Sequence, residues 1–309
     1  MPPSNFPFPV TPELTAISIA YRNAAFIADA VLPKVPVGLK AYRYRKYNLG
    51  DAFSIPDTKV GRTSRPNQVD FGFTEETGFC VDYGLDDPVP QDDINNAPSN
   101  YNPLGAAVEF VTNLIELDRE VRVARMVQDV ANYAAGNHVI LSGTDKLSDP
   151  ASDPIQIIMD AMDAMIVRPN VMVIGRLAWS ALIRNATINK AVNKNVGDKG
   201  VARKQDIAEL LELKDILVGE SYVNSSKKGQ NPSVSRVWGP HISLINRDVL
   251  SGPQRGVTYG FTATFGTRVA GAKEDSNIGL RGGQMVRAGE SVDEKICAPD
   301  MGYLIQDVV

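Results

Sequence analysis

The clearest periodic segment of the chain runs from Pro103 to about Ala134. Apolar side chains recur in it at steps of three and four residues, and no proline follows the first position. This spacing predicts one long amphipathic helix over 103–134, about 45 Å long at 1.5 Å per residue. The stripe expected to face the core consists of Phe110, Leu114, Leu117, Val121, Ala124 and Ala131. Since an average helix has about 11–12 residues, this one should organise the whole architecture.

Two extended segments precede this helix. Tyr42 and Tyr44, and later Val69, Phe71 and Phe73, alternate with polar residues, which is typical of half-buried strands. Between them lie about 20 polar residues, a long connection for a hairpin inside a compact domain. The pattern therefore predicts a loop that reaches away from the body toward a neighbouring molecule.

The first 40 residues contain seven of the 20 prolines. A helix is expected from Pro12 through Ala30, with Thr11 as its N-cap, inside an arm that lies along another surface. The alternative is a disordered segment. Residues 84–102, rich in Pro, Asp and Asn, are interpreted as a loop, and they lack the spacing of a calcium-binding loop.

Helical and extended patterns alternate over 151–250 and predict a compact α/β domain. Helices are expected at 154–167 (capped by Asp153), 177–184 and 204–213, and strands at 171–174, 216–223, 235–238 and 242–245. Trp179 and Trp238 are expected to anchor its core. The strands predicted at 259–265, 279–286, 294–297 and 302–306 should return to the first domain. The expected fold class is therefore α+β, with an inserted α/β domain.

Composition excludes several classes of protein. The 309 residues include 43% hydrophobic and 22% charged residues, as in ordinary globular proteins. We find no secretory signal and no apolar run that could span a membrane. Cys80 and Cys297 are far apart, which excludes a disulfide framework; they are expected to be buried thiols, or else to pair across a subunit contact. A net charge of −4 suits a container better than a nucleic-acid binder.

Catalytic motifs are missing from the sequence. His138 and His241 lie over 100 residues apart, outside any zinc or nucleophile motif, and are expected at exposed strand edges. No phosphate-binding glycine loop is present, and the paired aspartates lie adjacent in a proline-rich stretch. We therefore expect no catalytic residue, no cofactor, no metal and no enzymatic activity.

Two stretches carry a resemblance to a known family. Gly78–Pro90 (GFCVDYGLDDPVP), which leads into the long helix, and Leu117–Ala124 (LDREVRVA) within it, resemble major capsid proteins of tailed bacteriophages. The resemblance implies the Hong Kong 97 type capsid fold. It divides the chain into an N-terminal arm (1–40), an extended E-loop (41–83), a P domain (84–150) with its spine helix (103–134), an inserted A domain (151–250) and returning P-domain strands (251–309).

The same resemblance implies a function. A major capsid protein assembles as pentamers and hexamers, first into a procapsid, and forms the icosahedral shell around the double-stranded DNA of a tailed phage. The location would be the virion capsid, assembled in the cytoplasm of the host bacterium. The expected partners are further copies, a portal protein, a scaffolding protein, with or without a decoration protein, and non-specifically contacted DNA, but no membrane. Because this chain begins at Met1 with a short arm, the scaffold is expected to be separate. The alternatives are a cellular shell of the same fold that houses an enzyme cargo, and an unrecognised α/β enzyme.

Opposite charges suggest one contact between subunits. Three cations lie near the E-loop tip: Lys59, Arg62 and Arg65. Four carboxylates lie in the first half of the predicted helix: Glu109, Glu116, Asp118 and Glu120. Since the resemblance implies that an E-loop lies over the neighbouring spine helix, these groups are expected to meet across subunits. The alternative is that the cations belong to a solvated turn.

Overall fold

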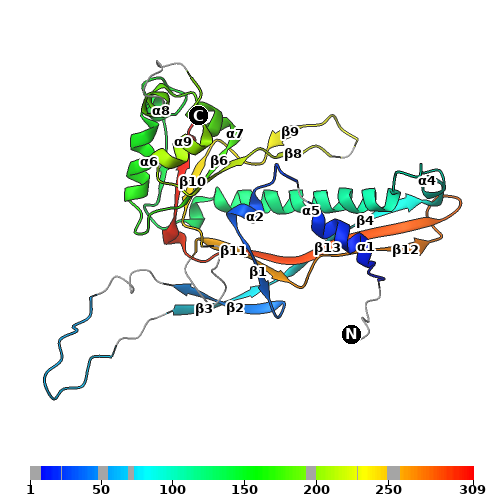
Figure 1. Ribbon diagram of the computed structural model, residues 1–309, viewed down its shortest axis with the longest axis horizontal. Helices are drawn as coiled ribbons and strands as arrows, with labels where there is room; N and C mark the ends of the chain where they lie inside the picture. Colours follow the sequence, from blue (N-terminus) through cyan, green and yellow to red (C-terminus); the bar gives the residue numbers. More distant parts are fainter. Residues whose placement is uncertain are drawn as a thin grey trace.

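A computed structural model describes residues 8–21, 23–47, 55–68, 73–192, 200–227, 229–248 and 258–309. Its central element is α5 (Pro103–Val127), which runs beside one sheet and meets a second, helix-covered sheet at its C-terminal end (Figure 1). Asn102 begins this helix by accepting hydrogen bonds from the N–H groups of Leu104 and Gly105 at 3.1 and 3.2 Å.

The long helix is shorter than predicted. It ends at Val127, and a 3-10 turn (Val130–Asn132) follows. The Asn132 side chain donates to the Met126 carbonyl at 2.8 Å, and the Tyr133 hydroxyl donates to the Val127 carbonyl at 2.5 Å. These side chains satisfy the last helical carbonyls, so the helix stops before Ala134.

The first sheet forms around a 14-residue strand, β13 (Gly283–Ile296). One edge of β13 pairs with β4 (Val81–Pro90), and the other pairs with β12 (Val269–Asp275) and β11 (Gly260–Phe265). β1 (Lys34–Val37) adds in parallel to β11. The prediction of a loop was therefore wrong for residues 84–95, because β4 extends to Pro90 and α4 (Gln91–Asn95) follows, whereas residues 96–102 form a loop as expected. Prolines are tolerated in β4 because its outer edge has no partner strand among the described residues.

The buried face of α5 is not the predicted one. Val108, Val111, Ile115, Val123 and Val127 are buried, and the N-terminal half of the helix packs on β4, β12 and β13. The predicted core stripe largely faces outward: Phe110 and Leu114 are 58% and 37% exposed, and Leu117 and Val121 are half-buried. Of the first five residues of the predicted stripe, Ala124 alone lies in the core. The helix is apolar on two faces, and sequence periodicity selected the wrong one.

The N-terminal arm contains two helices where one was predicted. α1 (Pro12–Ala20) packs against α5, and α2 (Ala28–Val31) follows after an irregular segment. The break has a physical cause: the N–H groups of Ile27 and Ala28 donate to the buried Glu120 carboxylate, and Tyr21 and Asn23 donate to Asn113. These tertiary hydrogen bonds replace the helical ones.

The second sheet has the strand order β5-β14-β10-β6-β7. Its strands are β5 (His138–Ile140), β14 (Gly302–Gln306), β10 (Ile242–Ile245), β6 (Val171–Gly175) and β7 (Asp215–Gly219). Its helices are α6 (Pro154–Asp163), α7 (Arg176–Leu182), α8 (Ala186–Val192) and α9 (Lys204–Leu210). Short 3-10 turns at Gly143–Asp145 and Pro299–Met301 connect the elements.

Most elements expected over 151–250 are confirmed, including the cap by Asp153 on α6. Two strands of this sheet come from outside 151–250. β5 lies in the range 84–150 and β14 in the range 251–309, and β14 pairs with both β5 and β10. β12 and α8 were not predicted.

Two antiparallel pairs extend from this body (Figure 1). β2 (Ala41–Tyr47) pairs with β3 (Phe73–Phe79), which forms the base of the predicted E-loop. β8 (Tyr222–Asn224) pairs with β9 (Val234–Arg236). The single strand expected over 216–223 is divided into β7 and β8, and β9 overlaps the strand expected over 235–238. Cys80 and Cys297 are free and buried in one small cluster with the side chains of Tyr42, Tyr44, Phe261 and Ala263.

Candidate functional site: contact surfaces and a buried joint

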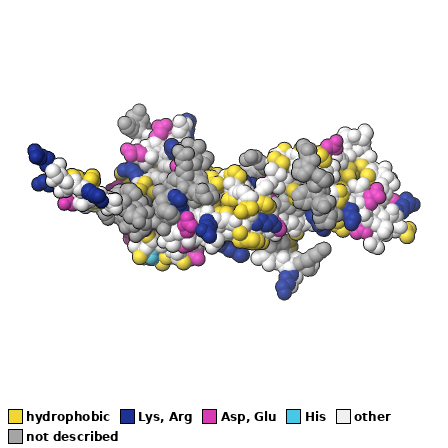
Figure 2. All heavy atoms as spheres, turned by 90° about the horizontal axis from the view of Figure 1, so that it is seen from below, with side chains coloured by type: hydrophobic (Ala, Val, Ile, Leu, Met, Phe, Trp, Pro, Cys, Tyr) yellow, Lys and Arg dark blue, Asp and Glu magenta, His cyan; other side chains and the backbone are white. Residues whose placement is uncertain are grey.

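The E-loop tip presents its cations to solvent. Lys59, Arg62 and Arg65 are all exposed, and dark blue side chains gather at the corresponding end of the elongated molecule in Figure 2. The tip is held locally: Asn67 donates to the Asp57 carbonyl at 2.9 Å, and Ser64 N–H donates to the Gly61 carbonyl at 3.0 Å. These bonds shape a turn, and among the described residues no ion pair is found for the three cations.

The four helix carboxylates expected to meet these cations divide into two pairs. Glu109 and Asp118 are exposed, and Asp118 forms an ion pair with Arg122 one turn later. Glu116 and Glu120 are buried and bonded inside the subunit, so they are withdrawn from the expected contact. The E-loop tip and the first half of α5 lie at opposite ends of the molecule, so any meeting would join two copies (Figure 1).

Glu120 joins three parts of the chain. Its carboxylate, 0% exposed, accepts hydrogen bonds from Ala28 N–H at 2.7 Å, from Trp238 Nε1 at 2.6 Å and from Ser221 Oγ at 3.2 Å. Ile27 N–H adds another at 3.0 Å. Burial raises the pKa of Glu120, while these donors favour its charged form and oppose that rise. The arm, the spine helix and the root of the β8–β9 hairpin therefore meet at one carboxylate.

Trp238 is thus not an anchor of the second-domain core alone. It belongs to the cluster that joins α5, α2 and the second sheet, whereas Trp179 lies in the core beneath the A-domain helices, as expected.

A network of ion pairs lies beside this joint. Arg268 contacts Glu290 through Nε at 2.8 Å and Glu116 through Nη2 at 2.7 Å. Arg119 contacts Glu290 at 2.5 Å and Asp29 at 2.8 Å, and Lys34 contacts Asp29 at 3.0 Å. Although burial alone would raise the pKa of Glu290, Arg119 and Arg268 hold it below its usual value. The network ties the arm to α5 and to β13.

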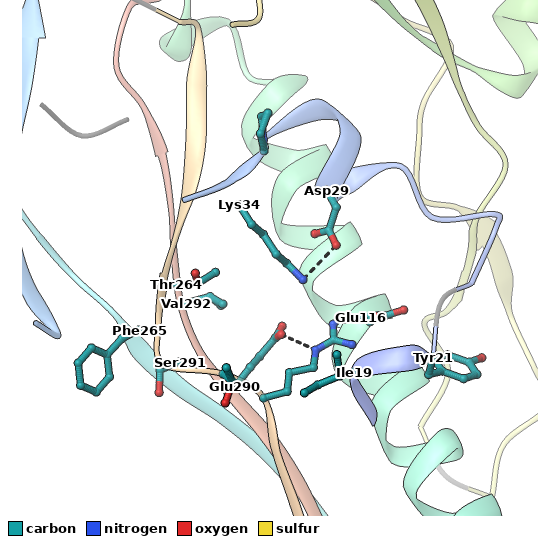
Figure 3. Close-up of a pocket in the computed structure, with 14 residues that line it drawn as sticks. Ile19, Tyr21, Asp29, Lys34, Glu116, Thr264, Phe265, Glu290, Ser291 and Val292 are labelled. Atoms are coloured by element: carbon teal, nitrogen blue, oxygen red, sulfur yellow. Dashed lines mark hydrogen bonds and ion pairs between the residues drawn. The ribbon is translucent and has the colours of Figure 1, made fainter. Parts of the chain in front are cut away.

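Part of this network forms the floor of a cavity of about 450 Å³ (Figure 3). Asp29 and Lys34 line it from the arm, and Glu290 from β13, with Ile19 and Phe265 at its apolar walls. Each of these three charged groups has an ion-pair partner. Its residues are arranged to hold the arm.

The histidines differ from each other. His138 is exposed on β5, as expected. His241 is half-buried beside Gly239 and accepts a hydrogen bond from the Asp307 N–H at 3.1 Å, so the expectation of an exposed edge was wrong for it. Among the described residues no group of three or more His, Cys, Asp or Glu side chains is placed to hold a metal ion.

Sequence reasoning missed Arg119, Arg268, Glu290 and Asp29. A helical-wheel signal for part of the network was present, because Glu116, Arg119 and Glu120 are spaced to share a face with Val108, Val111 and Ile115. Charges inside an apolar face predict buried ion pairs. Their partners, Glu290 on β13, Arg268 just before β12 and Asp29 in α2, lie far from them in the sequence and gave no such signal.

Within the described ranges, no helix is both long and apolar enough to cross a membrane. A scan against models of known protein families finds no match.

Comparison with curated proteins finds two full-length relatives. The chain is 54% identical over 306 residues to the major capsid protein of Pseudomonas phage JBD67, covering 99% of both chains. It is 28% identical over 312 residues to the major capsid protein of Burkholderia phage BcepMu, covering 97% of this chain and 96% of the relative.

Solved structures show the same fold at low identity. A phage-related protein from Bordetella bronchiseptica RB50 matches with a TM-score of 0.77 at 22% identity, over 97% of this chain and 98% of the other. The capsid of Cyanophage P-SCSP1u matches at 0.61 and 11%, over 93% and 89%. An encapsulin from Synechococcus elongatus PCC 7942 matches at 0.51 and 11%, over 96% of each chain. The fold is the Hong Kong 97 type capsid fold, and the chain belongs to the family of bacteriophage major capsid proteins.

Proposed function

We propose that this protein forms pentamers and hexamers that close into an icosahedral shell around the double-stranded DNA of a tailed phage. The supporting observation is the 54% identity, over nearly the whole chain, to a phage major capsid protein. The exposed apolar stripe of α5 fits a subunit whose surfaces are completed by further copies, and so do the exposed E-loop cations, for which no ion pair is found among the described residues. Its role is structural, without turnover of its own.

The partners follow from that role. Besides further copies, the shell takes up a portal protein and uses a separate scaffolding protein, with or without a decoration protein. It contacts the packaged DNA non-specifically and is assembled in the bacterial cytoplasm. A cellular shell around an enzyme cargo is the alternative, and the encapsulin shares the fold. Both full-length curated relatives are phage proteins, which favours the phage shell.

Electron microscopy of the purified protein with the scaffolding protein from the same genome tests the proposal. We expect closed particles with rings of five and six subunits. A stable monomer at high concentration under these conditions would overturn it.

Reversing the charge of two E-loop residues tests the expected contact between the E-loop and the α5 helix of a neighbouring copy. We propose that Lys59, Arg62 and Arg65 meet Glu109 and Asp118 of a neighbouring copy. Each exposed pair contributes only about 0–1 kcal/mol, but the contact repeats at every subunit. The double change Arg62→Glu and Arg65→Glu should leave the melting temperature of the subunit unchanged and reduce particle yield, more strongly at low salt, where repulsion is unscreened.

The neutral variant, Arg62→Gln with Arg65→Gln, is the matched control. It should lose less yield and show little dependence on salt. Normal yield of the reversed variant at low salt would mean that the cations belong to a solvated turn.

A further inference from the structure

One end of α5 carries a groove that is both apolar and acidic. It has a volume of about 380 Å³ and is lined by residues of β4, α4 and the start of α5. Tyr101 and Phe110, 55% and 58% exposed, form its aromatic part, and Asp87 and Asp93 lie beside them. Phe110 also begins the outward stripe, so groove and stripe form one continuous surface.

The acids of this groove differ from their neighbours in the chain. Asp86 is paired with Arg287 and Asp92 with Arg281. By contrast, among the described residues no ion pair is found for Asp87 or Asp93. Together with the exposed aromatic rings, this favours a partner surface that is basic and apolar.

The β8–β9 hairpin has the complementary chemistry. Residues 221–237 contain Lys227, Lys228 and Arg236 and no acidic residue. Because Tyr222 pairs with Arg236 and Asn224 with Val234, these four side chains share one face of the hairpin. Tyr222 and Val234 are 50% and 59% exposed on it, and the Arg236 guanidinium lies 4.7 Å from the centre of the Tyr222 ring.

A two-stranded hairpin with an exposed apolar face is only marginally stable alone, so this face is expected to be covered. Within one subunit it does not cover the groove, since both surfaces are exposed. The root of the hairpin is fixed to Glu120 through Ser221 and Trp238. α4 and the start of α5, whose residues line the groove, lie at the end of α5 remote from the second sheet (Figure 1).

We propose that the β8–β9 hairpin of one subunit docks into the Asp87–Asp93–Tyr101–Phe110 groove of a second copy. Tyr222 and Val234 pack on the aromatic rings, and Lys227 and Arg236 face the two aspartates. Such a contact joins two different surfaces of identical chains, so it propagates from subunit to subunit, as a shell requires. The inference rests on the proposed self-assembly.

A charge swap tests the contact. The hairpin variant carries Lys227→Glu and Arg236→Glu, and the groove variant carries Asp87→Lys and Asp93→Lys. Each should raise the protein concentration needed for half-maximal assembly about tenfold or more, because like charges then face each other in a partly desolvated contact. Combining all four changes should restore assembly to within about threefold of the unmodified chain, because opposite charges again face each other. Melting temperatures of the unassembled subunits identify any variant that fails to fold.

A second measurement does not depend on charge. Tyr222→Ser and Phe110→Ser should each impair assembly, and the double variant should lose less than the product of the two single effects, because both remove the same contact.

The outcomes separate the two proposals. If the unmodified chain forms no particles, the proposed function fails. If it forms particles and the hairpin variant assembles equally well, the hairpin contact alone is overturned. The hairpin contact is also overturned if combining the four substitutions does not restore assembly. It is overturned as well if Arg62→Glu with Arg65→Glu rescues the groove variant, because the E-loop would then be the segment that occupies the groove.

Discussion

Replacing Glu120 by alanine is expected to destabilise the subunit by about 3–5 kcal/mol, because it leaves several buried donors without an acceptor. These are the backbone N–H groups of Ile27 and Ala28, the Ser221 hydroxyl and the Trp238 indole N–H. They come from the arm and from the root of the hairpin, so the loss should loosen both. Urea unfolding of the unassembled subunit, followed by Trp fluorescence, measures the change.

Asp118→Ala provides the matched control, an acid two residues away on the same helix. Its side chain is 59% exposed and pairs only with Arg122 among the described interactions. This substitution should change the free energy of unfolding by no more than about 0.5 kcal/mol. Equal effects of the two substitutions would contradict the role given to Glu120.

Glu290→Gln should remove part of the acid sensitivity of the subunit. Arg119 and Arg268 hold the pKa of Glu290 below its usual value, despite the opposing effect of burial. A carboxyl with a lowered pKa stabilises the fold above its unfolded pKa of about 4.3, and this contribution is lost as the pH falls. At pH 7 the variant should be less stable by about 3 kcal/mol, because two buried guanidinium groups lose their shared anion. Below pH 4 the difference from the unmodified chain should shrink.

Glu274→Gln makes the same change at an exposed position of β12. Its unfolding curve should follow that of the unmodified chain at each pH. The raised pKa of Glu120 acts in the opposite direction, since its charged form is the one that burial disfavours. Comparing each variant with the unmodified chain cancels that contribution. A constant difference between pH 7 and pH 3.5 would show that Glu290 does not carry the acid sensitivity.

Local patterns predicted the elements that rest on local causes. Asp153 before Pro154 marked the start of α6, and the apolar runs at 171–174 and 242–245 became β6 and β10. Features decided by distant partners could not be predicted in this way. β4 forms across a proline-rich acidic stretch because β13, almost 200 residues later, supplies its hydrogen bonds.

The α5 helix shows most clearly what local sequence patterns cannot predict. Both of its faces carry apolar residues at helical spacing, so periodicity alone could not tell the face buried on the sheet from the face that remains exposed in one subunit. The same ambiguity between buried and exposed helix positions affected the predicted contact between the E-loop cations and the carboxylates of α5. Glu116 and Glu120 were grouped with Glu109 and Asp118 by charge, although Arg268, Trp238 and the arm bind them inside the chain.

The position of β14 has a consequence for synthesis on the ribosome. This strand lies between β5 and β10, and it is built from residues 302–306. While the chain is still being translated, β10 lacks its partner on that side, and the second sheet remains split into two parts. A chain interrupted before residue 302 would therefore expose two unpaired strand edges and fail to complete this core. Only a polypeptide translated through residue 306 can close the sheet, so products truncated before this strand should be open to proteases before they can enter a growing particle.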